Sequence, residues 1–240
     1  MDLKIKDVAE LLNVSETTIR RWLAEGKIPA YRLHHQYRFS RIEIENWVMS
    51  CKLKKERGEV TPFGENQIYP QREEEETEVI AKKGTQQFSL YRAVHKGGVF
   101  SEMDGSSKEE YIRLAMQEIA GELSLDADVL SELLLDREKL MPTALNHGVA
   151  VPHTRDFLLK GSSDVVAIVF PKKPIDWGAL DGEKVHTLFF LFACDDKRHL
   201  HLLAKLAHLS SNEKALGFFK SKPSKDRMLE FIKNWEATLN

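Results

Sequence analysis

The side chains best placed for chemistry follow a short apolar run at Gly148–Val151. Pro152 ends this run and fixes the backbone, so we expect His153 to project from the lip of a strand. A histidine there can act as a nucleophile, because much of its side chain is neutral near pH 7. If it accepted a phosphoryl group, positive or hydrogen-bonding neighbours would have to hold the phosphate oxygens. The candidates for that role are Arg137, His199 and Arg155.

Other polar residues could do chemistry, but each has a plainer interpretation. His201 lies two residues from His199, so the two cannot share one helix face. We interpret His147 as a loop residue and His186 as a rim residue at the start of an apolar strand. The Asp195–Asp196 pair lacks convergent partners, so we expect no metal site and no cofactor. No stretch resembles a phosphate-cradling glycine loop or a Ser-His-Asp constellation.

These residues need a layered body to position them. A capping box at Ser107–Glu110 begins one helix, and leucines at helical spacing end a second near Arg137. Buried strands are expected at Gly148–Val151, Val165–Phe170 and Thr187–Ala193, with further helices after them. Helices interleaved with short buried strands predict an α/β domain.

Four separated pieces of residues 87–240 carry a family resemblance: LLDREKL, GVAVPH, FPKKPIDWGALDGEKVHTLFFLFA and HLHLLAKLAHL. In this order they resemble the enzyme IIA domains of the phosphoenolpyruvate:sugar phosphotransferase system, in the fructose, mannitol and nitrogen-regulatory class. The resemblance implies a mixed sheet flanked by helices on both faces. It also implies that His153 is the phosphorylated histidine, His199 the second active-site histidine and Arg137 the arginine that precedes the site. An HPr-type protein, or its nitrogen-branch relative, is the implied phosphoryl donor.

Two departures from the family pattern lie beside His153. The family usually has Gly-Asn-Gly before the apolar strand, where this chain has Asn146-His147-Gly148, and Gly or Ala where this chain has Thr154. The Thr154 hydroxyl could bind phosphate, or its branched side chain could crowd the donor. We predict that Thr154, Asn146 and Gly148 support the phosphate site.

The basic N-terminal stretch has the pattern of a helix-turn-helix. Val8, Leu11 and Leu12 recur at helical spacing, Ser15 can cap a second helix, and Gly26 stands where that helix should end. Two short alternating strands and a third helix, begun by a capping box at Ser40, should follow. Arginine and short hydroxyl side chains on the second helix can contact bases and phosphates in the major groove of DNA. The two strands form a hairpin that resembles the wing of a winged helix domain. The predicted DNA-binding residues are Thr17, Thr18, Arg20, Arg21, Arg32 and Arg38.

The segments DVAELLNVSETTIRRWLAEGKIPAYR and YRFSRIEIENWV resemble the small winged helix-turn-helix of the excisionase and MerR superfamily. The wing turn of that family usually holds glycine, whereas this chain has His34-His35, and histidine tolerates a left-handed backbone better than most residues. Residues 1–57 contain 12 Lys and Arg against 8 Asp and Glu, a charge of only +4. We therefore expect DNA binding to need a homodimer or tandem sites.

The net charge also differs between the later segments of this chain of 240 residues. Residues 58–86 carry −4 and include the run Glu73–Glu76, whereas residues 87–240 carry −2. We predict a winged helix-turn-helix domain at 1–55, an acidic linker at 56–86 and an enzyme IIA-like α/β domain at 87–240. No apolar run reaches the ~18 to 20 residues that a membrane span needs. Two distant cysteines suggest the reducing cytoplasm.

These features predict a cytoplasmic bacterial transcription regulator that accepts a phosphoryl group on His153 and is not a stand-alone enzyme. Its partners would be DNA and an HPr-type protein, with no membrane. Two alternatives stay open. The chain could be a phosphocarrier whose head docks a protein, or a degenerate sensor whose His153 is never phosphorylated.

Overall fold

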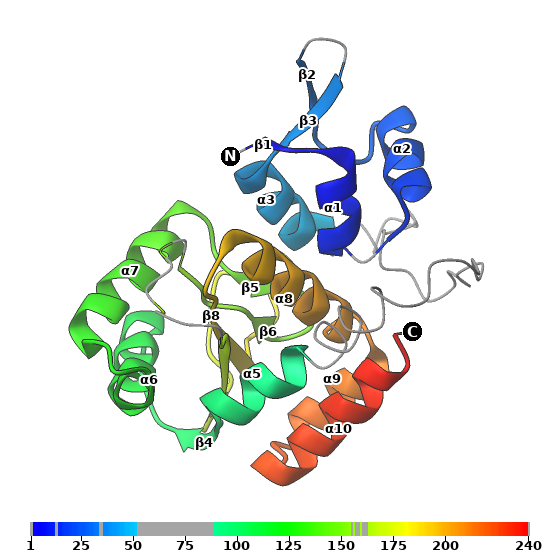
Figure 1. The fold of residues 1–240 in the computed structure, drawn as a ribbon. Helices are drawn as coiled ribbons and strands as arrows, with labels where there is room; N and C mark the ends of the chain where they lie inside the picture. Colours follow the sequence, from blue (N-terminus) through cyan, green and yellow to red (C-terminus); the bar gives the residue numbers. More distant parts are fainter. Residues whose placement is uncertain are drawn as a thin grey trace.

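The N-terminal part of the chain folds as a winged helix-turn-helix, which we call the head (Figure 1). The computed structural model describes residues 2–12, 14–33, 36–51, 89–154, 156, 159 and 163–239. The predicted linker, the wing turn His34–His35 and Arg155 lie outside these residues. The head contains three helices and an antiparallel sheet in the order β1-β3-β2. Its elements are β1 (Asp2–Leu3), α1 (Ile5–Leu12), α2 (Glu16–Ala24), β2 (Tyr31–Leu33), β3 (Gln36–Ser40) and α3 (Arg41–Cys51).

Local signals in the sequence explain the turns of the head. The Ser15 side chain accepts a hydrogen bond from the backbone N–H of Thr18, as an N-cap should. Gly26 has a φ of +64°, which a residue without a Cβ adopts without strain. Ile19 of α2 and Ile44 of α3 are fully buried in the core of the head. These contacts fix where α2 presents its outer face.

The described residues from Ser89 onward, which we call the body, are built on a mixed sheet of five strands in the order β4-β7-β8-β6-β5. β4 runs parallel to β7, β7 antiparallel to β8, β8 parallel to β6, and β6 antiparallel to β5. The central strands β7 and β8 are buried along their whole length, which explains their continuous apolar sequences. The strands are β4 (Val99–Met103), β5 (Ala144–Leu145), β6 (Val149–Ala150), β7 (Val165–Pro171) and β8 (Thr187–Phe192).

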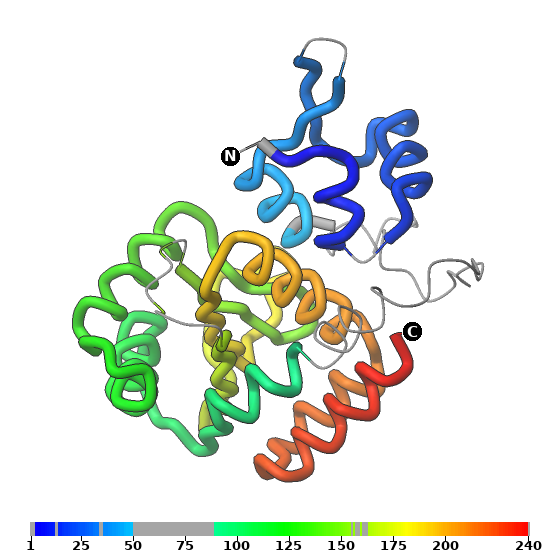
Figure 2. The backbone as a smooth tube through the Cα atoms, viewed as in Figure 1, coloured from blue at the N-terminus to red at the C-terminus, as the bar shows by residue number. Residues whose placement is uncertain are grey.

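Helices cover both faces of this sheet, as predicted (Figure 2). Alternate residues of β7 enter two different cores: Val166 and Ile168 belong to the core that contains residues of α5, α8 and α10, whereas Ala167 and Val169 belong to the core that contains residues of α6 and α7. The helices are α5 (Ser89–Gly97), α6 (Lys108–Leu123), α7 (Ala127–Leu140), α8 (Asp196–Leu209), α9 (Glu213–Lys220) and α10 (Lys225–Ala237). Among the described residues, no helix is both long and apolar enough to cross a membrane.

A buried carboxylate joins the last helix to the first helix of the body. Glu236 is fully buried and accepts hydrogen bonds from the backbone N–H groups of Leu90 and Tyr91 at the start of α5. Lys205 of α8 places its Nζ 2.6 Å from Glu236 Oε1, and burial lowers the pKa of this lysine even though Glu236 favours its charged form. Glu236 thus caps α5 and pairs a buried cation in one contact.

The head lies directly on the body. α1 and α3 pack against α8 (Figure 1). The apolar core of the head is continuous with the core on the α8 side of the sheet. At the edge of this contact, Arg41 Nη1 lies 2.8 Å from Asp196 Oδ1, which joins the first residues of α3 and α8. The hairpin of β2 and β3 projects away from the body (Figure 1).

Candidate functional site

His153 is held in one orientation by the end of β6. It forms an isolated parallel bridge with Leu191 of β8, whose backbone N–H donates to the Pro152 carbonyl. The imidazole Nδ1 lies 2.7 Å from the Val151 carbonyl oxygen. A carbonyl only accepts, so Nδ1 carries a proton, and in a neutral ring the lone pair is then on Nε2. The backbone therefore selects Nε2 as the nucleophilic atom.

His199 approaches the same point from the first turn of α8. Asp195 caps this helix by accepting from the backbone N–H of Arg198. The rings of His199 and His153 lie 5.1 Å apart between centroids with an interplanar angle of 60°. Burial, followed by the positive charge of His153, lowers the pKa of His199 well below its ordinary value of 6.5. A neutral His199 can donate one hydrogen bond without adding charge.

Arg137 brings a buried guanidinium to the site from the last turn of α7. One nitrogen, Nη1, donates to the Met141 carbonyl at 3.0 Å, which fixes the chain as it leaves the helix. The other, Nη2, donates at 3.0 Å to a carboxylate oxygen of Glu45. Arg137 is only 4% exposed, so its charge acts at short range with little water to screen it.

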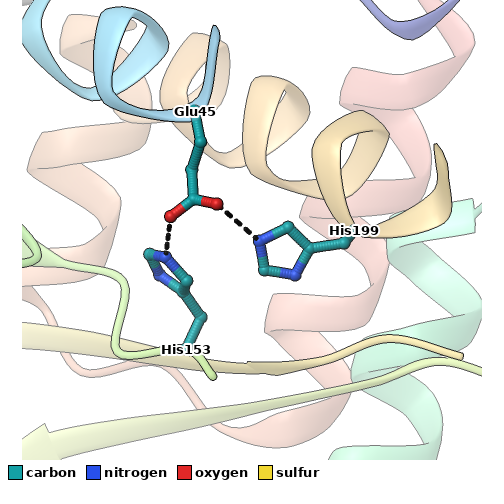
Figure 3. Close-up of side chains that lie close together, drawn as sticks. All are labelled: Glu45, His153 and His199. Carbon is teal, nitrogen blue, oxygen red and sulfur yellow. Dashed lines mark hydrogen bonds and ion pairs between the residues drawn. The ribbon is translucent and has the colours of Figure 1, made fainter. Parts of the chain in front are cut away.

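Glu45 is the residue that sequence reasoning missed. It comes from α3 of the head, is fully buried, and lies between the two histidines (Figure 3). Its Oε1 is 2.9 Å from His153 Nε2, and its Oε2 is 3.9 Å from His199 Nε2. Burial alone would raise the pKa of Glu45, but the His153 hydrogen bond and the surrounding positive charges outweigh burial and hold the pKa well below 4.5. Glu45 is therefore a carboxylate.

The residues predicted to support a phosphate lie in two turns, one between β5 and β6 and one directly after His153. Asn146 is buried, and Gly148 has a φ of +74°. The intervening His147 donates its backbone N–H to Asp181, which holds the turn between β5 and β6. The Thr154 hydroxyl accepts from the backbone N–H of Asp156 at 3.1 Å, so it closes a turn immediately after His153.

Two further histidines lie apart from the pair at the centre. The Nε2 of His201 lies 3.2 Å from the Ser89 hydroxyl on α5, away from His153. His186 Nε2 contacts the His147 carbonyl at 3.2 Å, and burial lowers its pKa. His201 therefore provides a matched control for His199.

The predicted DNA-binding residues lie on α2 and the hairpin. Thr17, Arg20, Arg21 and Arg32 are exposed, whereas Thr18 is half-buried and its hydroxyl lies 3.0 Å from the Ser15 hydroxyl. Arg38 is half-buried and donates to the side chain of Gln36 and the carbonyl of Tyr37, and Arg32 lies over the Tyr37 ring. α1 and α3, rather than α2 or the hairpin, lie against α8 (Figure 1).

Glu45, His153 and His199 are also a plausible set of metal ligands, since their donor atoms lie within 4.8 Å of one another. However, Arg137 donates to the same Glu45 oxygen that faces His153. A guanidinium at this oxygen would repel a metal cation bound there. We interpret the cluster as the Glu45 carboxylate anion, held by positive and hydrogen-bonding side chains around it.

The fold and this pair of histidines define the class of protein. Residues 93–235 match the family described as "Phosphoenolpyruvate-dependent sugar phosphotransferase system, EIIA 2". Since the match spans more than half of the chain, the chain belongs to this family. Residues 3–52 match a helix-turn-helix domain.

Individual proteins of known name are similar to the body in sequence and in fold. The nitrogen regulatory protein of Pseudomonas aeruginosa is 31% identical over 132 residues, covering 53% of this chain and 84% of that protein. The nitrogen regulatory protein of Escherichia coli is 29% identical over 135 residues, covering 55% and 82%. Among solved structures, nitrogen regulatory protein IIA-Ntr from Neisseria meningitidis superposes with a TM-score of 0.52 at 28% identity, covering 57% of this chain and 93% of that one.

Proposed function

We propose that this chain is a DNA-binding transcriptional regulator whose body accepts a phosphoryl group on His153 from an HPr-type donor. The observation that carries the proposal is the convergence of His153, His199 and Arg137 around one buried anion. The groups that bind the Glu45 carboxylate are those that a transferring phosphoryl group requires. Membership of the EIIA 2 family supports the same chemistry.

In the proposed step, neutral His153 attacks the phosphorus through Nε2, while Nδ1 keeps its proton and donates a hydrogen bond to the Val151 carbonyl oxygen. A nitrogen–phosphorus bond forms as the bond between donor and phosphorus breaks, and the leaving atom of the donor keeps the electron pair. Arg137 and His199 would hold the phosphoryl oxygens, because in-line transfer depends mainly on positioning and charge stabilisation. We propose that Thr154, Asn146 and Gly148 shape the adjacent loop.

We propose that the head binds DNA through Thr17, Arg20 and Arg21 on α2 and through the Arg32 and Arg38 side chains of the hairpin, with Thr18 acting at the helix cap. The match to a helix-turn-helix domain and the exposure of this face support the assignment. A regulator that meets both DNA and an HPr-type protein would work in the cytoplasm.

The test of phosphoryl acceptance is incubation of the full chain with phosphoenolpyruvate, enzyme I and HPr homologues, followed by intact mass measurement. We expect an acid-labile gain of one phosphate that His153→Ala abolishes. His199→Ala should slow labelling by ~10²-fold, as loss of one charge-stabilising donor commonly does. His201→Ala should label like the wild type, since His201 contacts Ser89 instead. Labelling that survives in His153→Ala would disprove the assignment.

A further inference from the structure

The Glu45 carboxylate occupies the position where a phosphoryl group on His153 would lie. It contacts the nucleophilic Nε2 at 2.9 Å and the Arg137 guanidinium at 3.0 Å, and it lies between His153 and His199 (Figure 3). Glu45 and both histidines are fully buried. A donor protein cannot deliver phosphorus to an atom that is buried beneath another helix of the same chain.

The contact also changes the chemistry of His153. The backbone fixes a proton on Nδ1, so a neutral ring would present a lone pair on Nε2 to the carboxylate oxygen. Two lone pairs at 2.9 Å would repel each other, so a proton lies between them. In this state His153 is an imidazolium paired with Glu45, and its Nε2 has no electron pair with which to attack phosphorus.

Several contacts around Glu45 hold the head in this position. Arg41 pairs with Asp196 at 2.8 Å four residues before Glu45 on the same helix. α1 and α3 pack on α8, and the two cores are continuous. Glu45 is therefore one part of a docked surface and does not reach the site by itself.

We propose that α3 is an intramolecular cap on the phosphoryl-transfer site, and that docking of the head and phosphorylation of His153 exclude each other. This inference rests on the proposed function. Glu45 imitates the phosphoryl group in the docked state, and phosphate on His153 displaces Glu45 because both anions need the same Arg137 and the same space. The body thereby controls the position of the head.

The DNA-binding face remains uncovered while the head is docked. Thr17, Arg20 and Arg21 are exposed in the docked state, and the hairpin projects away from the body. Phosphorylation would therefore not unmask the head. It would change a head fixed to α8 into a head that moves independently, which alters how two copies can reach neighbouring DNA sites.

The test compares Glu45→Lys with Glu43→Lys in the full chain. Both substitutions reverse a charge on α3, but Glu43 is exposed and Glu45 is buried beside Arg137. A lysine at position 45 should expel the head, so His153 should accept phosphate ~10-fold faster or more, in proportion to the fraction of open molecules. Glu43→Lys should label at the wild-type rate. If Glu45→Lys labels no faster than Glu43→Lys, the cap is disproved while the proposed function stands.

A second measurement does not need the phosphoryl donor. Diethyl pyrocarbonate acylates accessible neutral imidazoles, and peptide mapping reports the modification of His153 separately. We expect His153 to be protected in the wild type and in Glu43→Lys, and to react in Glu45→Lys. Equal reactivity in all three proteins would overturn the cap even if no protein accepts phosphate. If His153 reacts only in Glu45→Lys and no protein accepts phosphate, the cap is supported and only the proposed phosphorylation is disproved.

Phosphorylation itself should release the head. Small-angle X-ray scattering should show a larger radius of gyration for the phosphorylated wild type than for the unmodified protein, and a similar increase for unmodified Glu45→Lys. Phosphorylated His153→Ala cannot form, so that variant mixed with the donors serves as the control. An unchanged radius after complete labelling would show that the phosphate and the docked head coexist, which contradicts the proposal.

Discussion

Glu45 and His153 are 108 positions apart in the chain, yet Glu45 Oε1 lies 2.9 Å from His153 Nε2. The first residue belongs to the helix-turn-helix match and the second to the EIIA 2 match. The contact therefore joins the two parts of the chain at the atom proposed to receive phosphate. It is reinforced by Arg137, which donates to the same carboxylate oxygen.

Removing the Arg21 side chain should weaken DNA binding without changing the docked head, since Arg21 is exposed on α2. We expect Arg21→Ala to lose ~1–3 kcal/mol on a selected duplex if it reads a base, or to weaken all duplexes alike if it holds phosphate. Fluorescence anisotropy at several salt concentrations measures both. Arg113→Ala, an exposed arginine of the body that pairs with Glu132, is the control. Salt-insensitive binding would exclude this face as the DNA reader.

His199 should remain neutral at pH values where ordinary histidines are protonated, because burial and the charges of His153, Arg41 and Arg137 lower its pKa despite the opposing effect of Glu45. A released head should leave His199 with a pKa nearer 6.5. The released state then takes up a proton that the docked state excludes, so the His199 contribution to docking is complete above pH 6.5 and is lost as the pH falls below it.

The measurement for His199 is NMR of ring nitrogens in histidine-labelled protein across a pH series. Glu45→Lys should move the His199 titration upward, whereas Glu43→Lys should leave it unchanged. A wild-type His199 that titrates near 6.5 would contradict the buried neutral ring.

Glu236→Ala should strongly destabilise the body, because it leaves the Lys205 charge buried without its carboxylate and removes the acceptor for two backbone N–H groups of α5. Breaking a buried pair in this way costs about 3–5 kcal/mol of unfolding free energy. Glu230→Ala, an exposed residue of the same helix, should stay within about 0.5 kcal/mol of the wild type. Urea denaturation followed by circular dichroism compares the two, and equal midpoints would refute the prediction.

Gly148→Ala should destabilise the turn that precedes His153. The φ of +74° is strained for alanine, and an added Cβ would lie 2.5 Å from His186 Cδ2 and 3.0 Å from the Lys184 carbonyl oxygen. Gly121→Ala is the opposite case, since Gly121 is in α6 and no atom outside the neighbouring helix backbone lies within 4 Å of the added Cβ. It should stabilise the protein by about 0.5–1 kcal/mol. Thermal unfolding of both variants provides the comparison.

The elements predicted from the sequence are those whose signal is local. β7 and β8 are short, wholly apolar runs, and Ser15 and Gly26 mark the ends of α2, so each could be identified from neighbouring residues. β1, β4, β5, α5 and α9 lack such a signal and are not predicted. β4 is a half-exposed strand whose register with β7 shifts after Phe100, so it lacks a clean alternation of apolar and polar residues.

The two histidines of the site could be predicted from the sequence, but the contact of Glu45 with them could not. The segment RIEIENWV has an acidic residue directly beside buried Ile44, and an unusual carboxylate on the apolar stripe of α3 was the available signal. That pattern shows that Glu45 needs a partner without identifying it. The partner lies in another part of the chain, and only the docking of α3 on α8 brings it close.

Glu45 belongs to the same molecule as the histidine it covers, so the competition between carboxylate and phosphate is independent of how many copies a cell holds. How strongly Glu45 competes depends on its effective concentration at His153, which is set by the tether between the two parts of the chain. A cell could make more or less of this protein without moving the donor level at which half of the molecules open. Lengthening the tether, by contrast, would shift that threshold while every contact in the site stayed the same.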